Sequence, residues 1–186
     1  MTDQRYLTEK LLLALPGIGD RRFERAVIAM CSHDADGAMG IGIGSHSPDF
    51  DLHNLLGQFK IPTKGIVNHP VHIGGPVEPQ RGFVLHSLDW GGQGTLDVGR
   101  RWGLSSTLDI LRVIGTPKGP SHWLVALGYA GWGAGQLDGE MKRHGWHVAD
   151  GSDDLIFETE AKSRWHRAFA DSGIDDRLLS PNSGTA

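Results

Sequence analysis

Apolar residues fall along the chain in short runs with two kinds of spacing. Residues 26–31 are apolar at every position, a pattern typical of a central strand that is covered on both faces. Residues 38–44 instead alternate between apolar side chains and glycine, which indicates a strand with two different faces. Turn-forming residues 33–37 lie between the two runs, so the pattern predicts a hairpin.

The remaining apolar patterns predict more strands and four helices. Short apolar runs that end at glycine or proline predict strands at residues 7–15, 71–73, 82–86, 123–127, 146–148 and 155–157. Apolar residues at helical spacing predict helices at residues 51–59, 106–115, 134–141 and 161–173. Ser106 and Asp109 have the spacing of a capping box at the start of the second helix. Because strands come in adjacent groups with helices between them, the pattern favours an α+β fold.

The composition is that of a folded chain with an excess of glycine. Of 186 residues, 27 are glycine, which is about twice the usual share, and no Gly-X-Y period runs through them. No internal repeat or low-complexity linker divides the sequence. We therefore expect one domain over residues 1–179 and a disordered tail over residues 180–186.

The charge balance argues against a nucleic-acid-binding protein. Lys and Arg number 18 and Asp and Glu number 22, which gives a formal net charge of −4. Proteins that bind nucleic acids normally gather basic side chains on one face, and no such cluster or basic recognition helix is visible here. Direct DNA binding stays open as an alternative but is not favoured.

The single cysteine and the N-terminal sequence bear on localisation. Cys31 cannot form an intramolecular disulfide, which is consistent with a reducing compartment. The apolar run at residues 11–15 is too short for a signal sequence or a membrane span. We expect a cytoplasmic protein with no membrane segment.

Several sequence blocks stand in order along nearly the whole chain. They are LLLALP at residues 11–16, CSHDADGAMGI at 31–41, GGPVEPQRGFVLH at 74–86, ALGYAGWGAGQL at 126–137 and LIFETEAKSRW at 155–165. In this order the blocks resemble the bacterial YqgE/AlgH family. The resemblance implies a single compact α+β domain whose bent, branched β-sheet forms a partial barrel flanked by short helices. The family is uncharacterised, often carries the label of a transcriptional regulator, and brings no catalytic residues with it.

Many of the glycines lie inside these blocks, at predicted turns and helix ends and on one face of the strand at residues 38–44. Glycine in a strand often marks a bend or a close approach of another backbone. We therefore expect the glycines to serve a sharply bent, closely packed sheet.

Cys31 and His33 are the first candidate site. On a regular strand their side chains would point to the same face, about 6.6 Å apart, and an imidazolium there could lower the thiol pKa. The alternative is a buried core cysteine beside a turn histidine, which is the more common arrangement because free cysteine is among the most buried residue types.

The block at residues 74–86 supplies the other candidates. Arg81 lies in the same block as Gly74, Gly75 and His86, so its guanidinium could bind an acidic ligand or a partner carboxylate. It could also hold its own loop by bonding backbone carbonyls, and we favour that interpretation. These four residues, with Cys31 and His33, form the candidate ligand or redox site.

Other chemistry lacks its motif. Ten histidines are scattered through the chain, but HExxH is absent and a second cysteine for CxxC is missing, so we expect no metal site. Gly17 and Gly19 begin a dinucleotide fingerprint that Arg22 interrupts, and the glycine-rich residues 128–135, interpreted as a loop before a helix, contain no Lys or Arg. The lipase-like GxSxG sequence is also absent. We expect no cofactor and assign no catalytic residue.

Two hypotheses from different classes follow. The first is a non-enzymatic cytoplasmic binding protein for an unknown protein or small-molecule ligand, acting in regulation of gene expression. The alternative is a redox sensor or enzyme centred on Cys31 with His33 and Arg81; the question of enzyme activity stays open, with the balance against it. The two hypotheses differ in whether these three side chains meet in an accessible pocket.

Overall fold

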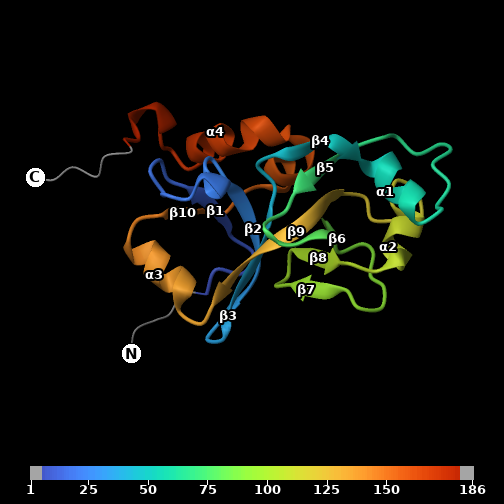
Figure 1. The fold of residues 1–186 in the computed structure, drawn as a ribbon, viewed down its shortest axis with the longest axis horizontal. Helices are drawn as coiled ribbons and strands as arrows, with labels where there is room; N and C mark the ends of the chain where they lie inside the picture. The colour runs from blue at the N-terminus through green and yellow to red at the C-terminus, as the bar shows by residue number, and fades with distance from the viewer. Residues whose placement is uncertain (1–5, 181–186) are drawn as a thin grey trace, which may run out of the picture.

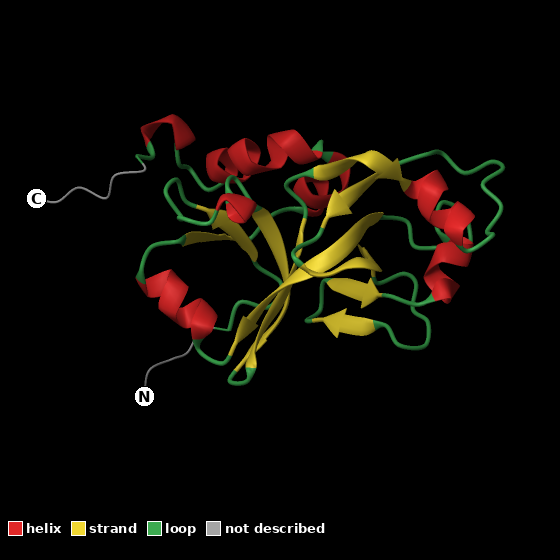
Figure 2. Ribbon diagram, in the orientation of Figure 1, coloured by secondary structure: helices red, strands yellow, loops and turns green. Residues whose placement is uncertain are grey.

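A computed structural model describes residues 6–180 of the chain. Ten strands form one curled sheet with the order β10-β1-β2-β3-β9-β6-β8-β7, and β4 and β5 branch from it because β5 also pairs with β9. Figure 2 shows this sheet in yellow, bent around its middle. The strands are β1 (Leu11–Ala14), β2 (Val27–Asp34), β3 (Gly37–Gly42), β4 (His46–Asp51), β5 (Pro70–Ile73), β6 (Val77–Ser87), β7 (Leu96–Val98), β8 (Trp102–Ser105), β9 (Trp123–Gly133) and β10 (Trp146–Ala149).

Short helices surround the sheet. α1 and α2 lie together at one end of the molecule, α3 lies at the other, and α4 crosses above β1 and β2 (Figure 1). The helices are α1 (Leu52–Gln58), α2 (Leu108–Val113), α3 (Gln136–Lys142) and α4 (Ala161–Asp171), with the π-helical turn η2 (Asp154–Glu158) and the 3₁₀ turns η1 (Arg21–Phe23) and η3 (Asp176–Leu178). The α+β class and the branched, partial-barrel sheet expected from the sequence are confirmed.

The central strands are buried on both faces, as their apolar sequence predicts. Val27, Ala29 and Cys31 of β2 pack in the core on one side of the sheet, while Ile28 and Met30 pack on the other. Burial of a Leu, Ile or Met side chain contributes about 1.5–3 kcal/mol each, so these two layers account for much of the stability.

β9 joins the two arms of the sheet. Its C-terminal residues 130–133 pair with β3, and its N-terminal residues 123–127 pair with β6 on one side, while Ala126 and Leu127 pair with β5 on the other. The predicted loop at residues 128–135 is therefore wrong, since the strand continues to Gly133. The glycines there belong to a strand, so they offer no phosphate loop.

The glycines at the branch point allow two backbones to touch. A Cβ added to Gly74 would lie 2.1 Å from the carbonyl oxygen of Gly128, and a Cβ on Gly75 would lie 2.1 Å from backbone atoms of Tyr129. No side chain fits between these segments. The predicted role of glycine in a closely packed sheet is confirmed at this crossing.

Other elements differ from the sequence prediction. Residues 155–157 form part of the π-helical η2 rather than a strand, since a short apolar run does not distinguish a strand from a buried helix. The predicted capping box at α2 is absent: Thr107 is the N-cap without a side-chain bond, and the Ser106 hydroxyl instead accepts a bond from Arg81. β4, β7 and β8 were not predicted, because β4 is largely polar and the short apolar patterns of β7 and β8 are interrupted by Asp97 and Gly103.

Of the tail expected over residues 180–186, positions 181–186 lie outside the described residues. Within residues 6–180, no helix has the length and apolar character needed to cross a bilayer.

Candidate functional site

Cys31 lies in the core between the sheet and α4 and is 2% exposed. Burial raises the pKa of its thiol to about 12, so the thiol stays protonated at neutral pH. Its Sγ atom donates a weak bond to the carbonyl oxygen of Ala29, at 3.5 Å. A buried, protonated thiol is a poor nucleophile, so this environment gives the redox alternative no support.

His33 does not join Cys31, because a β-bulge between Met30 and Ser32 breaks the alternation of side chains. The His33 ring lies on the other side of the sheet, where its Nδ1 accepts a bond of 3.1 Å from the backbone N–H of Leu7. Its Nε2 is 3.7 Å from Asp138. The same-face arrangement expected from the spacing is therefore wrong.

Arg81 and His86 lie apart from both. The Arg81 guanidinium donates to Glu78 at 3.2 Å and to the Ser106 hydroxyl at 3.1 Å, so it ties together its own strand and the start of α2. His86 is fully buried, where its Nε2 accepts a bond of 2.9 Å from the Ser105 hydroxyl and burial lowers its pKa. Cys31, His33 and Arg81 thus do not converge.

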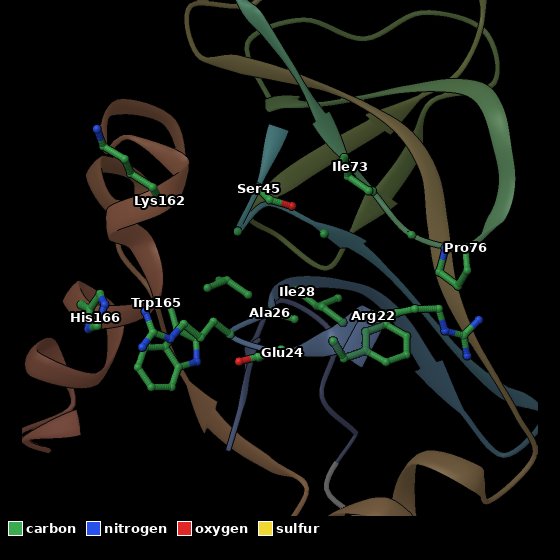
Figure 3. A pocket seen from close by; sticks show the side chains of 17 residues that line it. Arg22, Glu24, Ala26, Ile28, Ser45, Ile73, Pro76, Lys162, Trp165 and His166 are labelled. Carbon is green, nitrogen blue, oxygen red and sulfur yellow. The ribbon is translucent and has the colours of Figure 1, made fainter. Parts of the chain in front are cut away.

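Gly74 and Gly75 border a large groove, whereas Arg81 lines a separate, smaller pocket of about 240 Å³ beside α1 and α2. The two glycines lie on the floor of the large groove, which measures about 560 Å³ and runs between the start of β2, the β3–β4 and β5–β6 connections, and α4. Figure 3 shows Lys162, Trp165 and His166 on the α4 side of this groove, with Ile73 and Pro76 opposite.

Backbone rather than side chains forms the floor of the groove. Gly42 and Gly44 join Gly74 and Gly75 there, and the N–H of Gly42 donates to the carbonyl of Gly74 at 2.7 Å. A Cβ on Gly42 would lie 2.6 Å from the carbonyl oxygen of Ile73. The floor is bare because the strands cross too closely to admit side chains.

The wall on the α4 side is a fixed aromatic ring with a cation beside it. Trp165 is 5% exposed, and its indole N–H donates to the carbonyl of Ala14 at 2.9 Å, which fixes the ring in place. The guanidinium of Arg25 lies 5.6 Å from the centroid of this ring. Arg25 has φ of 53°, in the left-handed region that non-glycine residues rarely occupy.

The other basic side chains on the rim each lie beside a carboxylate. Arg22 pairs with Asp20 at 2.7 Å, Lys162 with Glu160 at 3.2 Å, and His166 with Asp176 at 2.7 Å. Arg25 differs, since among residues 6–180 its guanidinium has no hydrogen-bond or ion-pair partner and contacts the Trp165 ring instead. Glu24 is the carboxylate among the residues that line the groove.

A second cation lies buried beside the floor. Arg164 of α4 is 3% exposed, and its guanidinium donates to the carbonyl oxygens of Leu155 and Ile43 and to Nε2 of His72, at 3.1, 2.7 and 2.7 Å. His72 therefore carries its proton on Nδ1, which donates to the carbonyl of Val125 at 3.0 Å.

Burial lowers the pKa of Arg164 to about 10 and, with the neighbouring guanidinium, lowers that of His72 to about 4. Arg164 is thus charged and His72 neutral at pH 7. Every hydrogen-bond partner of this buried charge in the described chain is a neutral group.

A serine, a histidine and a carboxylate also meet at the surface near η2. Ser121 Oγ is 3.2 Å from Nδ1 of His122, and Nε2 of His122 is 3.8 Å from Glu158. His122 and Glu158 are both largely exposed, and the N–H of Ser121 already donates to Asp89. This group lacks the ordered base and the free backbone donor of a hydrolytic site.

Within residues 6–180, no cluster of three or more His, Cys, Asp or Glu side chains could hold a metal ion. The sequence also gave no direct signal for Arg25, Arg164 or Trp165 as site residues. The last two lie in the block at residues 155–165, but only the tertiary fold places α4 beside the glycines of the floor.

A family model for AlgH-like proteins matches residues 11–177, a range that contains every residue lining the groove. The chain belongs to the AlgH-like family. The resemblance found in the sequence blocks is thereby confirmed.

Two UPF0301 proteins align with the chain over nearly their full length. A UPF0301 protein of Sphingopyxis alaskensis is 58% identical, with 100% of this chain and 99% of the relative covered. A UPF0301 protein of Rhizorhabdus wittichii is 55% identical, with 97% of each covered.

Two solved structures share the fold. The solution structure of the AlgH protein from Pseudomonas aeruginosa has a TM-score of 0.79 at 33% identity and covers 100% of this chain and 99% of its own. A crystal structure of a Corynebacterium diphtheriae protein has a TM-score of 0.73 at 19% identity, with coverage of 97% and 94%. The AlgH-like fold therefore persists at low sequence identity.

Proposed function

We propose that this AlgH-like chain is a non-enzymatic, cytoplasmic binding protein that acts through the groove beside α4. The observation that carries the proposal is the groove itself, whose volume of about 560 Å³ lies within the usual range for small-molecule sites. Its backbone floor and its fixed Trp165 wall are formed before any ligand arrives, which reduces the entropic cost of binding.

The proposed biological role is regulation of gene expression through the bound ligand or a protein partner. The net charge of −4 supports an indirect role rather than direct reading of DNA. The single buried cysteine is consistent with the proposed cytoplasmic location.

Native mass spectrometry of the chain purified from its own cells tests the proposal. Ser45 is exposed and lines the groove, so Ser45→Trp fills the groove without entering the core. Ser163 is exposed on α4 and is not among the residues that line the groove, so Ser163→Trp is the matched control.

We expect the wild-type chain and the Ser163→Trp variant to retain a bound molecule that the Ser45→Trp variant loses. A clean mass of the free chain for all three proteins would contradict a tight ligand in this groove. Retention of the same molecule by Ser45→Trp would place binding elsewhere and equally overturn the proposal.

A further inference from the structure

We infer that the ligand of the groove is a small organic anion with a flat apolar body, held by Arg25 beside Trp165 and lying on the glycine floor. This inference rests on the proposed function and adds the chemical class of the ligand. It follows from an unpaired cation on the rim, a buried cation beside the floor, and the shape of the space between them.

Arg25 supplies the direct contact for a carboxylate or phosphate. Its guanidinium has five N–H donors, none of which meets an acceptor among residues 6–180, while the neighbouring Arg22, Lys162 and His166 are all paired. A guanidinium whose flat face packs on an aromatic ring keeps its N–H groups available at its edges, so these N–H groups can still bind an anion.

Arg164 adds a field of the same sign. Its guanidinium bonds the carbonyl of Ile43, whose chain neighbours Gly42 and Gly44 line the groove, and its second partner His72 precedes Ile73 on the opposite wall. The charge is shielded from water and faces neutral groups, so it is screened less than a surface charge. An anion in the groove would offset it.

The bare floor favours a flat body. Glycines 42, 44, 74 and 75 present backbone over the length of the floor, and Trp165 presents one fixed ring at its side. A planar apolar ligand can therefore contact both surfaces, whereas a bulky branched one would meet the strands.

A peptide is the less favoured occupant. A peptide that adds to a sheet needs an unpaired strand edge, but here the N–H of Gly42 already donates to Gly74, and the N–H of Ile73 donates to Ser45. Because these N–H groups at the groove edge are already used, a small molecule fits the contacts better than an added strand.

Three probes with one ring system measure the preference for charge. They are 2-naphthoate, the neutral 2-naphthamide and the cationic 2-naphthylmethylammonium, and each is titrated into the full chain by calorimetry. We expect 2-naphthoate to bind about tenfold more tightly than the amide, since a bond to a charged group adds about that factor. The ammonium probe should bind most weakly of the three.

Two neighbouring substitutions should act in opposite directions. Arg25→Gln should remove the roughly tenfold preference for 2-naphthoate over the amide. Glu24→Gln removes the carboxylate that lines the groove and should strengthen binding of 2-naphthoate. Arg112→Gln is the control. It makes the same change in net charge as Arg25→Gln, at an exposed position of α2 that does not line the groove.

The outcomes separate this inference from the proposed function. Equal binding of the anionic and neutral probes, blocked by Ser45→Trp, would keep the groove as a binding site and overturn the anionic class. Tighter binding of the ammonium probe, or of the neutral peptide acetyl-Ala-Ala-Trp-amide, than of 2-naphthoate would overturn it too. If no probe binds and native mass spectrometry finds only the free chain, both proposals fail.

Discussion

At the scale of single residues, the buried Arg164 is the unusual feature. Burial of a charge is costly, and here three neutral acceptors from η2, the β3–β4 connection and β5 satisfy it. The guanidinium therefore joins α4 to η2, to the β3–β4 connection and to β5 through hydrogen bonds. In doing so it also positions Trp165, the next residue of the helix, at the groove.

Removal of that guanidinium should be costly. Arg164→Met leaves buried carbonyls of Leu155 and Ile43 without a donor, so we expect the free energy of unfolding to fall by about 3 kcal/mol. Arg164→Lys should lose less, because an ammonium still donates. Urea denaturation measures the change, with Arg167→Met as an exposed control on the same helix that costs under about 1 kcal/mol. Equal losses for Met at 164 and 167 would contradict this role.

His72 makes stability depend on pH. Its pKa is lowered from 6.5 to about 4, first by burial and then by the charge of Arg164. Between pH 6.5 and pH 4, His72 is therefore mostly protonated in the unfolded chain and mostly neutral in the folded chain. The contribution of neutral His72 to the free energy of unfolding is fully present above pH 6.5. As the pH falls towards 4, this free energy decreases by about 3 kcal/mol at most.

Burial also lowers the pKa of His86 and of His147, and both act in the same direction. The His72→Gln variant separates its contribution, because glutamine can still accept from Arg164 but does not titrate. Denaturation midpoints between pH 7 and pH 4.5 should fall less steeply for this variant. An unchanged pH profile would show that His72 titrates normally in the folded chain.

At the scale of elements, the crossing of β9 with the β5–β6 connection sets the shape of the sheet. Gly74→Ala would drive a Cβ to 2.1 Å from the carbonyl oxygen of Gly128, so the strands must separate. We expect a loss of about 3 kcal/mol in the free energy of unfolding. The matched control is Gly57→Ala in α1, where a Cβ meets open space and should stabilise the chain by about 0.5–1 kcal/mol. Comparable losses from both variants would contradict the crossing as the constraint.

The sequence predicted most elements that have a clear period. The strand predicted at residues 7–15 is present over the shorter range Leu11–Ala14. The strands around residues 26–31 and 38–44 and helices α1, α3 and α4 are present because their burial follows the spacing of apolar residues. The glycine-rich half of β9 was missed because its pairing with β3 and the β5–β6 region is a property of distant segments. Local sequence indicated only a glycine-rich turn.

The candidate site was predicted only in part, for the same reason. Gly74 and Gly75 do line the groove, but Arg25 and Trp165 come from segments 140 residues apart that meet through tertiary packing. Cys31 and His33 were expected on the same face of the strand. The bulge between Met30 and Ser32 places them on opposite faces, since one extra residue turns the following side chains to the other face.

At the scale of the whole molecule, β9 makes the two arms of the sheet one unit. It pairs with β3 in one arm and with β5 and β6 in the other. If either arm unfolded, β9 would lose its pairing with that arm, and the other arm would be left with an unpaired strand edge. The six tryptophans are spread over all three buried clusters of the described chain, which makes each region visible separately.

We therefore expect a single cooperative unfolding transition. The indole N–H signals of Trp146 near α3, Trp165 on α4 and Trp123 near α1 and α2 should vanish at the same urea concentration in NMR spectra. Loss of the Trp123 signal at a clearly lower urea concentration would instead show that the arm with α1 and α2 is an independent unit.

The bare floor of the groove also governs how ligand preference can diversify. Substitution at Gly42 or Gly74 would drive a Cβ into neighbouring backbone. Such a variant would lose folding stability, so these positions cannot be used to change which ligand the groove binds. New preferences can arise only on the rim, at exposed positions such as Arg25, Ser45 and Lys162. A combinatorial library at these three sites would retarget the groove while the strand crossing stays intact.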